Sequence, residues 1–121
     1  MRVLLADDQP EVRSALRLLL EQEPWLRVIG EVSEANALLA QAHAARPDLV
    51  LLDWELPGLR AADPLTDLRS CCPELRVVAL SGRPEARDSA LMSGAWAFVS
   101  KGDPPERLLT TLRTLRPGSH G

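Results

Sequence analysis

The run 49-LVLLD-53 consists of four apolar residues followed by a carboxylate. An alternating run predicts a strand with one face in water, whereas an unbroken apolar run predicts a strand that is buried on both faces. Strands of the second kind occur in parallel sheets that are covered by helices on both sides. The run therefore favours an α/β domain, and it places a charged side chain, Asp53, at the end of a buried strand.

Four other short runs rich in apolar or β-branched residues recur along the chain: RVLLA (2–6), RVIGEV (27–32), RVVAL (76–80) and WAFV (96–99). The segments between them have helical spacing, as in Val12, Leu16 and Leu19 after the first run. Strands alternating with helices predict a (βα)5 three-layer sandwich with a parallel sheet. Because Gly30 and Glu31 suit the second run to a sheet edge, we expect the flavodoxin-like strand order 2-1-3-4-5.

Prolines fall where the helices are expected to begin: Pro10, Pro64, Pro84, Pro104 and Pro105. The fixed φ of proline suits the first helical turn, where its missing N–H is not needed. Asp63 and Asp103 are the expected N-caps, with Glu106 completing a capping box, and Gly94 is expected to end the fourth helix. We expect one domain over residues 1–117 and a disordered tail over 118–121.

Composition limits the class of protein. With 45% hydrophobic and 26% charged residues and no apolar run near the ~20 residues that span a membrane, we expect a soluble protein. Met1 leads directly into the first strand, which leaves no room for a signal sequence, and the adjacent Cys71 and Cys72 suit an ordinary disulfide poorly. A cytoplasmic location is therefore expected. The net charge of −3 argues against nucleic-acid binding by this chain and favours protein partners.

Polar side chains follow four of the predicted strands, at the edge where an open parallel sheet binds its ligands. They are Asp7, Asp8, Asp53, Ser81 and Lys101. Lys101 is the only lysine beside thirteen arginines, which suggests a position that requires a compact ammonium group. Any one of these residues has an ordinary explanation in a polar loop. Their occurrence at one edge predicts a site.

The residue types at this edge suit phosphoryl transfer. Three clustered carboxylates repel one another, which predicts a bound cation, and oxygen ligands favour Mg²⁺, with Mn²⁺ as the alternative. A carboxylate also acts as a nucleophile and then forms an acyl phosphate. An ammonium group and a hydroxyl group would neutralise and bind the phosphoryl oxygens.

Four segments carry a resemblance to a known family: LLADDQP (4–10), PDLVLLDWELPG (47–58), VVALSG (77–82) and FVSKGDPPERLLTTLR (98–113). In that order they resemble the receiver domain of two-component response regulators, most closely the subgroup that precedes LuxR-type helix-turn-helix domains. The resemblance implies a phosphoacceptor switch that reacts with a histidine kinase or phosphotransfer protein and catalyses only its own phosphorylation and dephosphorylation. Phosphorylation would change either its binding to a partner protein or its pairing into a homodimer. A DNA-binding domain would follow if the chain is a fragment of a longer regulator.

The resemblance also implies a metal set. Asp53 would be the phosphoacceptor. Asp8 and Asp53 would bind Mg²⁺ together with the main-chain carbonyl of Glu55, and Asp7 would act through water.

Further roles concern the phosphoryl group and the switch. Ser81 would bond the phosphoryl group and move toward it, and Lys101 would pair first with Asp53 and then with a phosphoryl oxygen. Phe98 would be the switch aromatic, with ordinary core packing as the alternative. Trp54 is expected to serve packing.

Some features depart from the family or leave the function open. The stretch between Ser81 and Lys101 is shorter than in typical receivers, which puts the usual output surface in doubt. Glu55 and Arg83 would either pair across the mouth of the site or remain independently solvated.

The alternatives to a phosphoacceptor are a receiver-like interaction module that is not phosphorylated and a small Mg²⁺-dependent phosphohydrolase.

Overall fold

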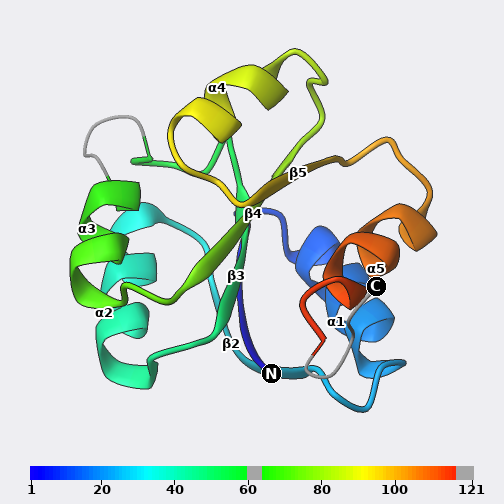
Figure 1. The fold of residues 1–121 in the computed structure, drawn as a ribbon, viewed down its shortest axis with the longest axis horizontal. Coiled ribbons are helices and arrows are strands. Elements are labelled where there is room, and N and C mark those ends of the chain that lie inside the picture. Colours follow the sequence, from blue (N-terminus) through cyan, green and yellow to red (C-terminus); the bar gives the residue numbers. More distant parts are fainter. Residues whose placement is uncertain (60–63, 117–121) are drawn as a thin grey trace.

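The strands form one five-stranded parallel sheet of order β2-β1-β3-β4-β5, seen in Figure 1. The structure is a computed structural model that describes residues 1–59 and 64–116. The strands are β1 (Arg2–Ala6), β2 (Arg27–Val32), β3 (Leu49–Asp53), β4 (Arg76–Ser81) and β5 (Ala97–Ser100). The predicted parallel sheet, its order and the edge position of β2 are confirmed. The predicted tail at 118–121 and the predicted N-cap Asp63 lie outside the described residues.

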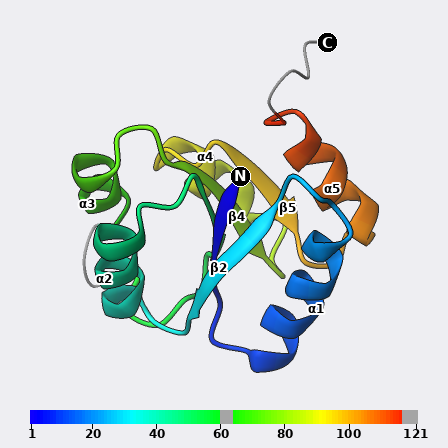
Figure 2. The same cartoon turned by 90° about the horizontal axis from the view of Figure 1, so that it is seen from below.

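Helices cover both faces of this sheet. They are α1 (Pro10–Glu21), α2 (Ala35–Ala45), α3 (Pro64–Cys71), α4 (Ala86–Met92) and α5 (Pro105–Arg113). One core cluster packs α1 and α5 on the sheet and the other packs α2, α3 and α4, so the predicted three layers are confirmed (Figures 1 and 2). Within the described ranges, none of these helices has the length and apolar character needed to cross a bilayer.

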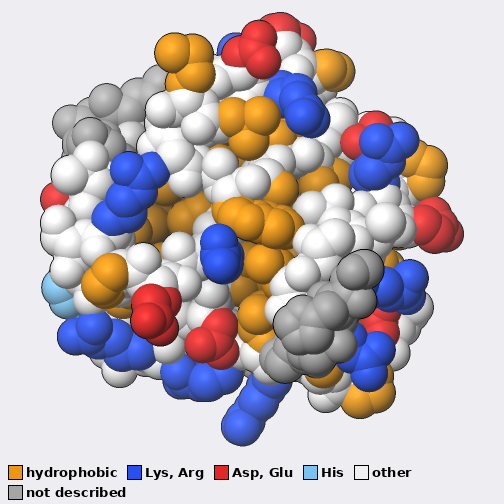
Figure 3. Space-filling model, in the orientation of Figure 1, with side chains coloured by type: hydrophobic (Ala, Val, Ile, Leu, Met, Phe, Trp, Pro, Cys, Tyr) orange, Lys and Arg blue, Asp and Glu red, His pale blue; other side chains and the backbone are white. Residues whose placement is uncertain are grey.

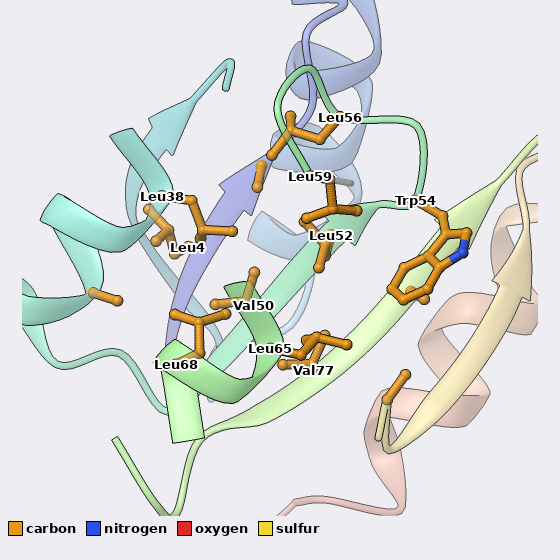
Figure 4. Close-up of a cluster of buried hydrophobic side chains, with 14 of the residues drawn as sticks. Leu4, Leu38, Val50, Leu52, Trp54, Leu56, Leu59, Leu65, Leu68 and Val77 are labelled. Atoms are coloured by element: carbon orange, nitrogen blue, oxygen red, sulfur yellow. The ribbon is translucent and has the colours of Figure 1, made fainter. Parts of the chain in front are cut away.

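The central strand β3 shows why the apolar run was decisive. Val50 and Leu52 belong to the cluster beneath α2 and α3, whereas Leu49 and Leu51 belong to the cluster beneath α1 and α5. Figure 4 shows the first of these clusters, with leucines of α2 and α3 against the sheet. All four side chains are at most 1% exposed, and full burial of such a side chain stabilises the fold by about 1.5–3 kcal/mol.

The start of α5 differs from the prediction. Its N-cap is Pro104, with ψ 148° and no side-chain capping bond, so Asp103 as the N-cap and the capping box with Glu106 were wrong. The residue before a proline is disfavoured in helical conformation, and Pro105 therefore forces Pro104 to remain extended. The carboxylate of Asp103 instead accepts a hydrogen bond from the backbone N–H of Ser100 at 3.3 Å.

Helix α4 has seven residues and is the shortest of the five helices in the described ranges. It begins two residues after Pro84, which lies in the preceding turn. Gly94 follows its C-cap with φ 109°, and its N–H donates to the carbonyl of Leu91 at 3.1 Å. The predicted glycine cap is therefore confirmed.

A side chain from α3 also holds the end of α4. The guanidinium of Arg69 donates to the carbonyl of Ser93 at 3.1 Å. A Cβ atom on Gly94 would lie 1.1 Å from Nη2 of Arg69. Glycine is thus required at this position both for its backbone conformation and for the space that Arg69 occupies.

Candidate functional site

The carboxyl ends of the strands bring the predicted site residues to one edge of the sheet (Figure 1). Asp7 and Asp8 follow β1, Asp53 ends β3, Ser81 ends β4 and Lys101 follows β5. The backbone N–H of Lys101 donates to the carbonyl of Ser81 at 2.8 Å, which ties the end of β5 to the end of β4. Parallel strands explain this convergence, because their carboxyl ends all meet at the same edge.

Lys101 forms the ion pairs at the centre of the site. Its Nζ lies 2.7 Å from Oδ2 of Asp7 and 3.5 Å from Oδ1 of Asp53. Asp7 is thus the nearer partner, although the family resemblance pointed to Asp53. Both carboxylates are buried, with 1% of Asp7 and 2% of Asp53 exposed. Because a buried carboxylate without a counter-charge is strongly disfavoured, the ammonium of Lys101 is the counter-charge that Asp7 requires.

The three aspartates form the group that can hold a cation. Asp7, Asp8 and Asp53 each offer a carboxylate oxygen, and these oxygens lie within 4.8 Å of one another. In the described part of the chain they face a single ammonium group, so two negative charges lack a partner. A divalent cation with oxygen ligands, Mg²⁺ or Mn²⁺, would supply that charge. Asp8 is the exposed member of the group, whereas Asp7 and Asp53 are buried.

Two short backbone turns orient the buried carboxylates. Oδ1 of Asp7 accepts the N–H of Gln9 and Oδ1 of Asp53 accepts the N–H of Glu55, each at 2.9 Å. An aspartate that bonds the backbone two residues further along forms such a turn readily. Among the described residues, none bonds Oδ2 of Asp53. The turn therefore fixes the Asp53 side chain and leaves one of its oxygens available.

The electrostatics of the site shift two ionisations. Burial raises the pKa of Asp53, and the negative charge of Asp7 adds to the rise, despite the Glu55 N–H bond and the nearby Lys101. Burial acts to lower the pKa of Lys101, but the hydrogen bond to Asp7 and the charges of Asp53 and Asp7 outweigh it, so that this pKa is raised. Lys101 thus stays charged while Asp53 resists ionisation.

Ser81 is fully buried and its hydroxyl has two partners. Its Oγ donates to Oε1 of Glu55 at 2.7 Å and accepts the N–H of Arg83 at 3.0 Å. The pairing of Glu55 with Arg83 was wrong. Both side chains are exposed and have different partners, which is nearer to the alternative of two independent charges. The Arg83 guanidinium instead lies 3.5 Å from a carboxylate oxygen of Glu85. Glu55 faces the serine because a buried hydroxyl requires an acceptor.

The two aromatic residues near the site lie in or against the core. Trp54 is 8% exposed and belongs to the cluster shown in Figure 4, which confirms its packing role. Phe98 is partly buried, packs against the same cluster and lies opposite Ala79 in the sheet. This position agrees with ordinary packing, and the role of Phe98 in a switch stays a prediction.

The strand order and the acidic site beside the switch point between β1 and β3 place the chain in the class of flavodoxin-like domains. Comparison with protein families is more specific. Residues 3–113 match the family described as the response regulator receiver domain. The chain belongs to this family.

Relatives in sequence support the predicted subgroup. The nitrate/nitrite response regulator NarL of Escherichia coli K12 is 33% identical over 118 residues, which cover 96% of this chain and 55% of NarL. The transcriptional activator DevR/DosR of Mycobacterium tuberculosis is 37% identical over 103 residues, covering 84% of this chain and 48% of the activator. The chain thus spans about half the length of these relatives.

Solved structures agree with the assignment. The isolated receiver domain of RcsB from Salmonella enterica serovar Typhimurium, with the phosphomimetic BeF₃⁻, superposes with a TM-score of 0.86 at 25% identity, covering 100% of this chain and 91% of that one. A LuxR-family response regulator from Aurantimonas sp. SI85-9A1 superposes with a TM-score of 0.83 at 26% identity, covering 94% and 83%. The resemblance to receivers of the LuxR subgroup is therefore confirmed.

Proposed function

We propose that this receiver domain accepts a phosphoryl group on Asp53 from a partner histidine kinase or phosphotransfer protein. The observation that carries the proposal is the state of Asp53: buried at the end of β3, close to Lys101, and with no partner for Oδ2 among the described residues. As a receiver domain the chain is a signalling switch rather than a conventional enzyme. Its catalysis is limited to its own phosphorylation and dephosphorylation.

The reaction uses the free oxygen of Asp53. Because Oδ1 is held by the Glu55 N–H and lies near Lys101, we assign the attack on phosphorus to Oδ2. The new O–P bond forms as the P–N bond to the donor histidine breaks, and the electron pair of that bond remains on the imidazole. The ammonium of Lys101 neutralises charge on the transferred phosphoryl group, and the Ser81 hydroxyl donates to one of its oxygens.

A divalent cation fits the same site. The excess of carboxylates over ammonium groups in the described site supports Mg²⁺ bound by Asp8, Asp53 and the main-chain carbonyl of Glu55, with Asp7 acting through water. Mn²⁺ would use the same oxygen ligands. The cation, when bound, neutralises charge on the acceptor carboxylate and on the phosphoryl oxygens.

The output surface would involve α4, β5 and α5. Two large apolar side chains are exposed in this region, Met92 at the end of α4 (89%) and Trp96 just before β5 (36%). Figure 3 shows hydrophobic side chains gathered in the middle of one face, with charged side chains around them. A second copy of the chain would cover such a surface on phosphorylation, with Phe98 and Ser81 as switch residues. NarL and DevR/DosR are about twice as long, and DevR/DosR is a DNA-binding transcriptional activator by name, which supports a DNA-binding domain in a longer protein.

The test is the mass of the intact protein after incubation with acetyl phosphate and Mg²⁺. The wild type should gain one phosphoryl group, and Asp53→Asn should gain none. Asp48→Asn is the matched control, because it changes an exposed aspartate just before the same strand, and it should be phosphorylated like the wild type.

Two outcomes would replace this proposal. Rapid consumption of many equivalents of acetyl phosphate would indicate the phosphohydrolase. A wild type that forms no adduct, even with beryllium fluoride in excess, would indicate an interaction module that is not phosphorylated.

A further inference from the structure

The hydroxyl group of Ser81 is fully engaged in this structure. Its single proton is donated to Oε1 of Glu55 at 2.7 Å, and its oxygen accepts the N–H of Arg83 at 3.0 Å. The serine is buried, whereas Glu55 is exposed on the rim of the site. A bond to a charged acceptor is stronger than one between neutral groups, so the carboxylate holds this rotamer of the serine firmly.

The engaged proton matters because Ser81 has only one. A serine hydroxyl that donates to Glu55 cannot donate to a phosphoryl oxygen on Asp53 at the same time. We propose that Glu55 is a positioning residue that restrains Ser81 in the unphosphorylated conformation and so sets how readily the domain switches. This inference rests on the proposed function, since it requires an anionic group on Asp53 to which Ser81 would turn.

Glu55 is also placed to sense that group. Its backbone N–H donates to Oδ1 of Asp53 at 2.9 Å. Burial raises the pKa of Asp53, and the Glu55 carboxylate, held against Ser81, already contributes to this rise through its charge. A phosphoryl group adds about −1.5 to −2 charge, which repels the Glu55 carboxylate and favours its departure from Ser81. Acceptance of the phosphoryl group and release of the serine are therefore coupled through one residue.

Release of Ser81 from Glu55 would change the hydrogen bonds of the loop before α4. The Ser81 hydroxyl holds the backbone of Arg83, and the carbonyl of Arg83 accepts the N–H of Ala86 at the first turn of α4. Rotation of the serine would thus break a bond that fixes this loop. The bond between Glu55 and Ser81 is thus part of a chain of hydrogen bonds that leads from the acceptor site to the first turn of α4.

The experiment is a titration with beryllium fluoride in saturating Mg²⁺, with the apparent Kd read from amide NMR signals. The variants are Glu55→Ala, Glu55→Gln, Ser81→Ala and the double variant Glu55→Ala/Ser81→Ala. Glu85→Ala is the matched control, because it removes a carboxylate of the same region that pairs with Arg83 at 3.5 Å. Urea unfolding of each variant verifies that it is folded.

Glu55→Ala should tighten fluoroberyllate binding by about three- to tenfold when Ser81 is present, which corresponds to the loss of one charge-assisted hydrogen bond at a partly exposed site. In the Ser81→Ala background the same change should tighten binding clearly less, by at most about twofold, because the repulsion between Glu55 and the bound anion remains but no hydroxyl is left to be restrained. Glu55→Gln should fall in between, since its amide oxygen still accepts, and Glu85→Ala should match the wild type.

Three results would overturn the restraint. Equal tightening in both backgrounds would show that Glu55 acts by charge alone, full tightening by Glu55→Gln would give the same conclusion, and an unchanged or weakened Kd in Glu55→Ala would show no restraint. A wild type that binds no fluoroberyllate, or binds it as Asp53→Asn does, would overturn the proposed acceptor and the restraint together. Failure of the restraint alone leaves wild-type binding intact, so the two failures are distinct.

Discussion

Asp48 and Asp53 stand at the two ends of β3 and are in opposite situations. Asp48 is exposed, and its Oδ2 accepts the backbone N–H of Arg2 at 2.8 Å. Its own backbone N–H and carbonyl bond the flanking strands at Arg2 (2.9 Å) and Arg76 (3.1 Å). Asp53 is 2% exposed, shares its surroundings with Asp7 and Asp8, and has a raised pKa.

The difference separates a structural carboxylate from a functional one. At the amino end of β3 the carboxylate bonds a backbone donor and its charge remains in water, so it links strands at little cost. At the carboxyl end the fold gathers more negative charge than the described residues neutralise. Clusters of like charge that cost stability are typical of functional sites, because the chemistry there requires those groups. The predictions below test this contrast, starting with the largest expected effect.

Removing Lys101 should increase the excess of negative charge at the carboxyl end of β3. We expect Lys101→Met to lower the free energy of unfolding by about 2 kcal/mol without Mg²⁺, because Asp7 is left buried without a counter-charge. Urea denaturation measures the change. The double variant Asp7→Asn/Lys101→Met should recover most of the loss, and Lys101→Met with wild-type stability would show that the ion pair does not stabilise the fold.

The exposed member of the acidic group should matter most for the metal. We expect Asp8→Asn to weaken Mg²⁺ binding by about tenfold, or ~1.4 kcal/mol, and Asp7→Asn to weaken it less, because Asp7 is already paired with Lys101. Isothermal titration calorimetry or Trp54 fluorescence follows the binding, and Asp48→Asn is the control with no expected effect. The reverse order for Asp7 and Asp8 would contradict the assignment of Asp8 as the direct ligand.

The two ends of β3 should respond differently to the same substitution. Without Mg²⁺ at neutral pH, Asp53→Asn should raise the free energy of unfolding by about 1 kcal/mol, because it removes a buried charge that neighbouring carboxylates repel. Asp48→Asn should change it by less than about 0.5 kcal/mol, since an amide oxygen still accepts the Arg2 N–H. If Asp53→Asn instead lowers the free energy of unfolding, the negative charge at the carboxyl end of β3 is already neutralised by its surroundings.

The pH dependence of stability in the wild type and in Asp53→Asn gives an independent test of whether the Asp53 charge destabilises the fold. A raised pKa means that the folded protein binds the Asp53 proton more tightly than the unfolded chain does. The associated stability is fully present below the unfolded pKa and is lost as the pH rises through the folded pKa. The difference in free energy of unfolding between Asp53→Asn and the wild type should therefore be absent below the unfolded pKa of Asp53 and grow as the pH rises through the folded pKa. Urea unfolding at several pH values measures this difference.

A small effect is expected for Glu31, a carboxylate away from both ends of β3. Hydrogen bonds from Arg17 and then Arg13 lower the pKa of Glu31, at distances of 2.8 and 2.9 Å. A lowered pKa gives stability that is present above the unfolded pKa and is lost as the pH falls through the folded one. Because the pair is partly exposed, Glu31→Gln should cost about 0.5 kcal/mol at neutral pH and less in high salt. A loss as large as that of Lys101→Met would remove the contrast between surface and site.

Local sequence signals predicted most of the fold. The runs at 2–6 and 49–53 coincide with β1 and β3, because buried parallel strands require continuous apolar residues, and the more polar run at 27–32 coincides with the edge strand β2. The five site residues followed from the same signal, since each stands directly after or at the end of such a run. The start of α5 was missed because two adjacent prolines shift the helix by one residue relative to its expected N-cap.

Contacts between distant side chains were beyond the reach of these signals. The bond between Glu55 and Ser81 joins residues 26 positions apart, and it depends on which rotamer of each side chain the packed site permits. The charges of Glu55 and Arg83 predicted either a pair between them or two separately solvated groups, and neither alternative included a bond to Ser81. The preference of Lys101 for Asp7 over Asp53 is likewise a matter of less than 1 Å in the folded structure. Strand spacing predicts which residues meet, but not the order of their distances.

Lys101 has a practical consequence for chemical labelling. Its side chain is the only ε-amino group in the 121 residues, and it is 22% exposed while paired with Asp7. Amine-directed reagents and immobilisation on amine-coupling surfaces therefore have one side-chain target, which lies inside the acceptor site. Coupling through an introduced tag would leave the site intact. The extent of acylation at Lys101 would in turn report how strongly the buried carboxylates hold the ammonium group.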